Sequence, residues 1–107
     1  PPDIAPAAPP SEPALSDRGR EGRAVFRATC ADCHGALAQG AASGPALLHP
    51  AYASGHYSDA DFRAAVREGR APRLWSFGPM PAHPDLPEED LERVIAFVRE
   101  LQSATGL

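Results

Sequence analysis

The stretch Cys30-Ala31-Asp32-Cys33-His34 decides how the rest of the sequence is interpreted. Two thiols separated by two residues and followed at once by a histidine form the C-x-x-C-H signature of covalent haem attachment. Thiols with this spacing at a helix end reach the two vinyl groups of a porphyrin, and the adjacent histidine then lies under the iron. One ring nitrogen of His34 ligates the iron, and the other needs a hydrogen-bond acceptor. The stretch therefore predicts one covalently bound haem c.

Two other kinds of site use the same residue types. A thioredoxin-type dithiol usually lies at the start of a helix after a strand, whereas this pair lies at the end of a predicted helix. A structural zinc site usually has four ligands. Cys30, Cys33 and two of the histidines are able to supply them, but the sequence lacks the H-x-x-x-H pair that typically accompanies C-x-x-C. Haem attachment is the favoured interpretation, with zinc binding and dithiol redox chemistry as alternatives.

The 107 residues are enough for one compact domain. Fourteen acidic residues against ten arginines, with no lysine, give a formal charge of −4. This balance argues against a nucleic-acid-binding protein, which needs a basic face. No stretch approaches the roughly 20 apolar residues of a membrane span, and no signal-peptide pattern is present, so we expect this form of the chain to be soluble.

The beginning of the chain differs from the rest in composition. Residues 1–14 hold six of the thirteen prolines, and proline lacks an amide donor and fixes its own backbone angle. We therefore expect residues 1–15 to form a disordered tether, either a spacer that followed a signal peptide or an upstream membrane anchor, or a processing remnant. Residues 16–107 are expected to form the folded domain. Its core is small and needs an additional source of stability, such as a bound cofactor.

The first of three predicted helices contains the cysteine motif. Ser16 is a candidate cap, and Gly22, Phe26 and Cys30 fall on one face at steps of four. Gly35 is expected to end this helix. A glycine inside a helix costs about 1 kcal/mol relative to alanine, so Gly22 suggests a close approach by another element.

The other two predicted helices cover Asp59–Glu68 and Pro87–Gln102. Ser58 and Asp61 form a weak capping box for the second helix, and an acidic first turn suits the third. Long loops are expected over residues 36–56 and 70–86, and no alternating strand pattern is present. The predicted fold class is all-α. The apolar face of the last helix consists of Leu91, Val94, Ile95, Val98 and Leu101.

Over about residues 16–102 the sequence resembles the class I cytochromes c. Four segments carry the resemblance. Gly22, Phe26 and the cysteine motif match the family pattern G-x-x-x-F-x-x-x-C-x-x-C-H, and Gly44-Pro45-Ala46-Leu47 is similar to the family's G-P-x-L loop. Met80-Pro81 is similar to its methionine–proline pair, and residues 94–98 are similar to its closing helix. The resemblance implies the cytochrome c fold, with three main helices and long loops around one haem. It also implies that the first and last helices cross near Gly22 and Phe97, and that the Pro45 carbonyl accepts a hydrogen bond from His34.

Met80 is the predicted second axial ligand. A lone methionine is more often core filler, but Met80 lies between Pro79 and Pro81 in a stiff loop and matches the family's methionine. A thioether ligand raises the reduction potential relative to a second histidine. The competing candidates are expected to be surface or hydrogen-bonded residues instead, and they are His49, His56 and His83.

Four further residues are candidates for the haem surroundings. Tyr57 and Trp75 combine a large apolar body with a polar tip that suits a hydrogen bond to a haem propionate. Arg70 and Arg73 carry planar guanidinium groups that match a carboxylate. Ordinary packing explains the two aromatic residues equally well, and solvent exposure explains the two arginines.

A six-coordinate haem leaves no open position for a substrate, so the expected function is single-electron transfer and not enzymatic catalysis. The expected partners are redox proteins: a periplasmic dehydrogenase (for sulfite or alcohol), a terminal oxidase or another cytochrome. Such partners dock through small, transient interfaces guided by charge. Without the lysine ring of mitochondrial relatives, contacts between arginine and Asp or Glu are expected to take its place.

Covalent haem attachment takes place on the oxidising side of a membrane, so the expected location is the bacterial periplasm. Two alternatives stay open from the sequence. One is a haem domain or subunit of a larger oxidoreductase, with the proline-rich segment as its linker. The other is a gas-binding haem module in which Met80 dissociates from the iron.

Overall fold

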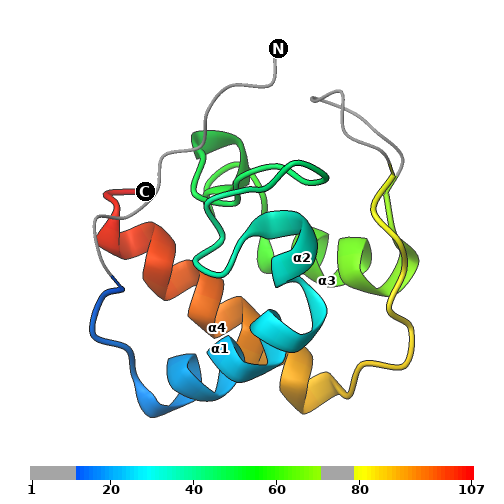
Figure 1. The fold of residues 1–107 in the computed structure, drawn as a ribbon, viewed down its shortest axis with the longest axis horizontal. Helices are drawn as coiled ribbons and strands as arrows, with labels where there is room; N and C mark the ends of the chain where they lie inside the picture. The colour runs from blue at the N-terminus through cyan, green and yellow to red at the C-terminus, as the bar shows by residue number, and fades with distance from the viewer. Residues whose placement is uncertain (1–11, 71–78) are drawn as a thin grey trace.

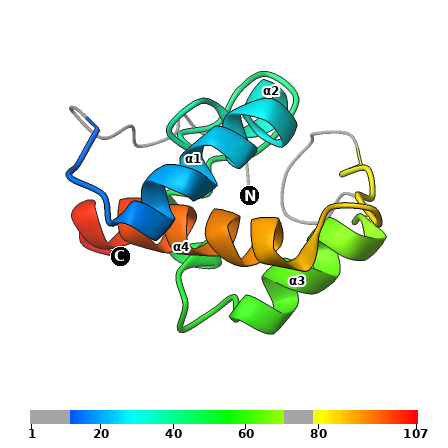
Figure 2. The same ribbon diagram turned by 90° about the horizontal axis from the view of Figure 1, so that it is seen from below.

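The computed structural model describes residues 12–70 and 79–107. Within these residues the chain forms α1 (Asp17–Thr29), α2 (Ala31–His34), the 3₁₀ turn η1 (Pro50–Tyr52), α3 (Asp59–Glu68) and α4 (Glu88–Ala104). Figure 1 shows the arrangement, and in Figure 2 α1 and α2 lie on one side of α4 while α3 lies on the other. No strand occurs in the described part of the chain, where two isolated bridges are the only β-type pairings. The all-α prediction is confirmed.

Helix α1 begins as predicted and ends earlier than predicted. The Ser16 hydroxyl accepts a hydrogen bond from the Gly19 amide at 2.9 Å and so caps the helix. We expected one helix up to Gly35, but α1 ends at Thr29 and the chain turns at Cys30 before α2 starts. Cys30 has φ −113°, well outside the usual helical value of about −63°. The expectation of one continuous helix was wrong. The spacing of the motif residues fits a single helix face, but it does not require that the helix be continuous.

Helices α1 and α4 cross at Gly22. A β-carbon on Gly22 would lie 1.9 Å from the Arg93 carbonyl oxygen and 3.0 Å from the Phe97 β-carbon. Beside this contact the rings of Phe26 and Phe97 pack with centroids 5.3 Å apart and an interplanar angle of 57°. The crossing that the resemblance implies is therefore present, and the glycine is what permits it.

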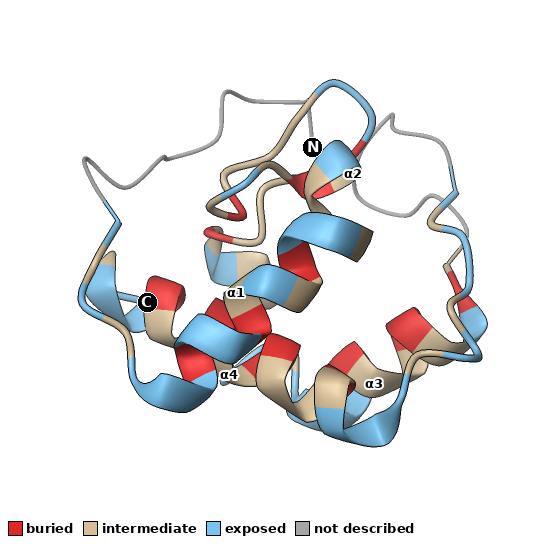
Figure 3. Ribbon diagram, turned by 60° about the horizontal axis from the view of Figure 1, so that its bottom comes forward, coloured by how far each residue is buried: buried red, intermediate tan, exposed pale blue. Residues whose placement is uncertain are grey.

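Helix α4 supplies most of the core. Its predicted apolar face is buried, and α1, α3 and the long loop add residues to the same cluster, so that the buried surfaces of the helices face one another (Figure 3). The helix starts at Glu88, follows Pro87 and continues to Ala104, two residues beyond the predicted end. The buried residues of this cluster are Phe26, Ala38, Leu48, Phe62, Val66, Leu91, Val94, Ile95, Phe97, Val98 and Leu101.

Helix α3 has the predicted boundaries. The Ser58 hydroxyl accepts from the Asp61 amide at 3.1 Å, and the Asp61 carboxylate accepts from the Ser58 amide at 3.0 Å, which completes the capping box. Gly69 ends the helix with φ +76°, a backbone angle that favours glycine. None of the helices among the described residues is long and apolar enough to cross a membrane.

Candidate functional site

The cysteine motif lies at the junction of α1 and α2. Cys30 joins the two helices, and Cys33 and His34 belong to the short α2 turn. The His34 amide donates to the Cys30 carbonyl at 3.0 Å, and the Gly35 amide donates to the Ala31 carbonyl at 2.8 Å. Both thiols are free and half-buried. One turn of backbone therefore presents all three residues that the sequence predicts for haem attachment.

The imidazole of His34 is buried, and a hydrogen bond fixes its orientation. The side chain is 8% exposed, and its Nδ1 atom lies 2.9 Å from the Pro45 carbonyl oxygen. A carbonyl only accepts, so Nδ1 carries the hydrogen and Nε2 has the lone pair that a metal requires. Burial lowers the pKa of His34 below its usual range, and the hydrogen bond to Pro45 opposes that shift. The Nε2 atom of the imidazole is thus the nitrogen with the lone pair, which suits a metal ligand.

Gly44 lets the segment that carries Pro45 lie directly on α2. A β-carbon on Gly44 would lie 2.3 Å from the Cys33 carbonyl oxygen and 3.0 Å from the Cys33 β-carbon. The amide of Ala41 donates to the Gly44 carbonyl at 3.1 Å, which closes a turn just before Pro45. The glycine–proline pair of the sequence thus has a physical reason, because the first residue permits the approach and the second supplies the acceptor for His34.

The Cys30 thiol does not have the environment of a reactive dithiol nucleophile. Burial first, and then repulsion from Cys33, raise the pKa of the Cys30 thiol to about 11. A reactive dithiol requires the opposite shift, because the thiolate is the nucleophile. Across residues 12–70 and 79–107, no three His, Cys, Asp or Glu side chains gather in a group that could hold a metal ion. The described residues therefore favour neither the dithiol nor the zinc alternative.

Met80 lies in a different part of the fold from α2. Its backbone pairs with that of Arg70, through hydrogen bonds of 3.0 Å and 2.8 Å, and its half-buried side chain packs against the hydrophobic core. In Figures 1 and 2 the yellow segment that begins near residue 80 passes the C-terminal end of α3, away from α2, and leads to the start of α4. The structure thus presents the histidine and the methionine on separate segments.

Two further candidates have other contacts in the structure. Tyr57 packs edge-on against Tyr52 with ring centroids 5.3 Å apart. The Arg70 guanidinium donates to the Gly69 carbonyl at 2.8 Å and to the Ala64 carbonyl at 3.4 Å, at the C-terminal end of α3, where a cation is favourable. Contact of either side chain with a haem stays a prediction, and Arg73 and Trp75 lie outside the described residues.

The three remaining histidines have different surroundings. His49 accepts a hydrogen bond from the Ala51 amide at 3.0 Å through its Nδ1 atom and so caps η1. His56 is exposed, and His83 is half-buried, with its amide bound to the Val66 carbonyl at 2.6 Å. His49 and His56 are thus hydrogen-bonded and exposed, respectively, and whether any of the three histidines binds iron stays a prediction.

Residues 17–98, from the first residue of α1 well into α4, match the family described as cytochrome c oxidase, cbb3-type, subunit III. The chain belongs to this cytochrome c family. A curated relative of this cytochrome is cytochrome c oxidase subunit 2 of Alkalihalophilus pseudofirmus, which is 34% identical over 88 residues. The match covers 77% of the chain and 25% of the relative, so the chain spans about a quarter of that protein's length. The resemblance to class I cytochromes c is confirmed, and with it a domain for haem-based electron transfer.

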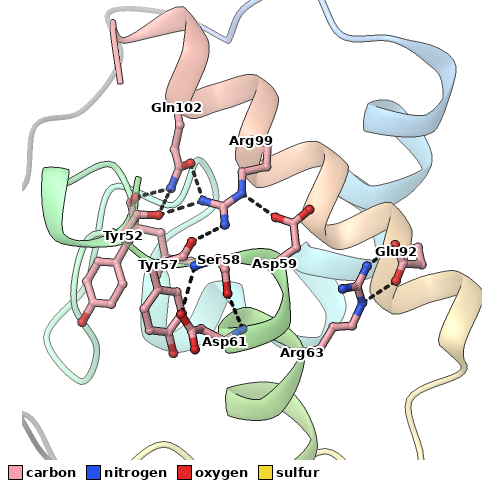
Figure 4. Close-up of polar contacts among 10 residues, drawn as sticks. Tyr52, Tyr57, Ser58, Asp59, Asp61, Arg63, Glu92, Arg99 and Gln102 are labelled. Atoms are coloured by element: carbon pink, nitrogen blue, oxygen red, sulfur yellow. Dashed lines mark hydrogen bonds and ion pairs between the residues drawn. The ribbon is translucent and has the colours of Figure 1, made fainter. Parts of the chain in front are cut away.

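Arg99 has a role in this cytochrome that the sequence analysis missed. Its guanidinium donates to the Asp59 carboxylate at 2.9 Å, to the Tyr52 carbonyl at 2.8 Å and to the Tyr57 carbonyl at 2.6 Å (Figure 4). One side chain of α4 thus holds the end of the long loop and the start of α3. No signal in the sequence separates Arg99 from the other arginines.

Gln102, one turn further along α4, holds the same loop closer to the cysteine motif. It is 3% exposed, and its amide nitrogen donates to the Leu47 carbonyl at 3.0 Å and to the Tyr52 carbonyl at 2.9 Å. Arg99 donates in turn to the Gln102 side-chain oxygen at 2.8 Å (Figure 4). Leu47 is two residues from Pro45, so α4 braces the segment that contacts His34. The one feature of the sequence that pointed to this role is that Gln102 is a polar residue directly after the last residue of the helix's apolar face.

Proposed function

We propose that this cytochrome domain is a single-electron carrier that holds one haem c through thioether bonds to Cys30 and Cys33. The observation that carries the proposal is the buried His34 imidazole, whose Nδ1 atom is held by the Pro45 carbonyl at 2.9 Å beside the two free thiols. When bound, the haem supplies an iron that gains or loses one electron.

The residues around the motif have separate roles in this proposal. Cys30 and Cys33 attach the cofactor from one turn of backbone, and His34 ligates the iron through Nε2. The Pro45 carbonyl fixes the tautomer of His34 and makes the ring a stronger ligand. Met80 is the second axial ligand, which is supported by its place in the family's methionine–proline pair and by the separate segment that carries it.

The Met80→Ala substitution tests the axial ligand. In the oxidised, haem-loaded protein we expect a sulfur-to-iron charge-transfer band in the red region of the spectrum. Met80→Ala should abolish that band and lower the reduction potential, because the thioether stabilises the reduced iron. His83→Ala, in the same segment, is the matched control and should leave the band unchanged. A wild-type spectrum without the band contradicts the assignment, and so does a band that survives in Met80→Ala.

We propose a terminal oxidase as the electron acceptor, with the domain on the periplasmic side of the membrane. The family description and the name of the relative both refer to cytochrome c oxidase. The relative is about four times as long as the matched region, which favours a haem domain or subunit of a larger oxidoreductase. A free carrier that accepts electrons from a periplasmic sulfite or alcohol dehydrogenase is the second candidate.

Surface charge indicates how such a partner docks. Each arginine in residues 12–70 and 79–107 forms an ion pair with a carboxylate of its own chain. With fourteen acidic residues against ten basic ones, carboxylates are in excess. The partner's docking face should therefore be basic, and electron transfer should slow as salt screens the attraction.

Rapid mixing separates the two candidate partners. The reduced protein is mixed with membranes of the source organism, and the oxidised protein with its periplasmic extract and sulfite or alcohol. Fast oxidation by the membranes, inhibited by salt, is the expected result. Fast reduction by the extract with no reaction at the membranes supports the free carrier. If neither mixture reacts, the proposed partners are wrong.

A further inference from the structure

We infer that Arg67 is a positioning residue for Met80, because it fastens to α3 the segment that follows the methionine. The inference rests on the proposed function, in which Met80 is an axial ligand.

The contacts of Arg67 converge on one short segment. Its Nη1 atom faces the carbonyl oxygens of His83 at 3.5 Å and Pro84 at 3.3 Å, and it donates to the Leu86 carbonyl at closer range. Its Nη2 atom donates to the Glu88 carboxylate at 2.9 Å. The Arg67 side chain is 26% exposed, so these contacts are partly shielded from water. A single guanidinium therefore holds residues 83–88.

The segment depends on such an outside donor. Residues 79–87 include Pro79, Pro81, Pro84 and Pro87, and proline has no amide hydrogen with which to form regular backbone pairing. Each proline removes one amide donor from the segment, so its carbonyl groups rely in part on donors from another element. Arg67, in the last turn of α3, is the side chain that supplies them among the described residues.

The residues that directly follow α3 also hold Met80 itself. The backbones of Met80 and Arg70 exchange two hydrogen bonds, and the His83 amide donates to the Val66 carbonyl at 2.6 Å. A β-carbon on Gly69 would lie 2.6 Å from the Met80 carbonyl oxygen. The methionine is thus held at the near end of a segment whose far end is held by Arg67.

Arg63, one turn earlier on α3, provides the matched control. Its guanidinium forms a two-point ion pair with Glu92, at 2.6 Å and 2.9 Å, and a longer pair with Glu88 at 3.9 Å. Both partners belong to α4, and among the described residues Arg63 and Arg67 share one partner, Glu88, at the far end of the segment. Replacing Arg63 removes a connection between the same helix and α4 without loosening the segment that carries Met80.

The experiment compares the Arg67→Gln, Arg67→Lys and Arg63→Gln variants of the haem-loaded protein. Glutamine cannot reach all the acceptors, so residues 83–88 should detach more often and Met80 should leave the iron more often. For Arg67→Gln we expect carbon monoxide to bind the reduced form about tenfold faster, as the loss of one or two hydrogen bonds predicts. The red-region band of the oxidised form should also disappear at a lower temperature than in wild type, while helix content is unchanged.

The controls separate positioning from general stability. Arg67→Lys retains the charge but lacks the planar guanidinium group with its several donors, so its rate of carbon monoxide binding should lie between those of wild type and Arg67→Gln. Arg63→Gln should bind carbon monoxide at the wild-type rate. Equal rates in wild type and Arg67→Gln overturn the inference, as does an equal increase in Arg63→Gln. A wild-type protein without the band overturns the ligation of Met80 itself, which is a different result from a band that is insensitive to Arg67.

Discussion

Replacing Gly22 by alanine is expected to lower the melting temperature of the haem-loaded protein by roughly 8–16 °C. The added β-carbon would lie 1.9 Å from the Arg93 carbonyl oxygen and 2.4 Å from its carbon. These are backbone atoms of α4 and cannot move aside as the end of a flexible side chain does. The two helices must separate, which also opens the contact between Phe26 and Phe97.

The size of this effect follows from two opposing terms. Alanine at a helix position is favoured by about 1 kcal/mol over glycine, while overpacking a tight contact costs about 3 kcal/mol at the upper end of the usual range. The net loss of about 2 kcal/mol corresponds to roughly 8–16 °C for a domain of this size.

Thermal unfolding followed by circular dichroism measures the effect of Gly22→Ala. The control is Gly55→Ala, because a β-carbon on Gly55 meets nothing within 4 Å, and its melting temperature should stay near that of wild type. A Gly22→Ala protein as stable as Gly55→Ala would show that α1 and α4 do not cross as closely as the structure indicates.

The Gly44→Ala substitution is expected to disturb the iron ligand as well as the fold. Its β-carbon would lie 2.3 Å from the Cys33 carbonyl oxygen, so the turn that carries Pro45 must move away from α2. His34 then loses the acceptor that holds its Nδ1 atom at 2.9 Å. A buried donor without a partner costs about 1–3 kcal/mol, and a less basic imidazole stabilises the oxidised iron less.

Two readouts distinguish Gly44→Ala from a general loss of stability. We expect a lower melting temperature together with a higher reduction potential, whereas Gly22→Ala should lower the melting temperature with little change in potential. Potentiometric titration of both variants and of Gly55→Ala provides the comparison. If Gly44→Ala retains the wild-type potential, the Pro45 carbonyl does not tune His34.

The parts of the fold that depend on local pattern could be predicted from the sequence. Ser58 and Asp61 marked the start of α3, and the spacing of apolar residues from Leu91 onward marked the buried face of α4. Gly22 was informative because a costly residue within a helix needs a reason, and the structure supplies that reason in the crossing with α4.

The break at Cys30 could not be predicted from the same pattern. Residues 30, 33 and 34 have a spacing that fits a continuous helix, and the turn at Cys30 appears only in its backbone angle. The short η1 turn within the long loop could not be predicted either, since it forms where the His49 side chain caps it.

The roles of the residues that hold the loops around the candidate site could not be predicted, because these roles depend on tertiary contacts. Arg67, Arg99 and Gln102 act on backbone carbonyl groups that are distant in sequence. Arg67 and Arg99 resemble any charged residue on a helix surface, and only its position directly after the apolar face of α4 distinguishes Gln102. Arg70 illustrates the converse. Its guanidinium is a candidate for a haem propionate, which stays a prediction, and the structure shows it in contact with carbonyl groups at the C-terminal end of α3, the helix that precedes it.

The most direct test of the central claim is a redox titration of the matured wild-type protein, followed by its visible spectrum. A domain that carries single electrons on one haem should show one reversible transition that fits the transfer of a single electron, with the same spectra in the oxidative and the reductive direction. A protein that shows no reversible transition, or one that requires more than one electron, would contradict the claim that this cytochrome domain is a single-electron carrier.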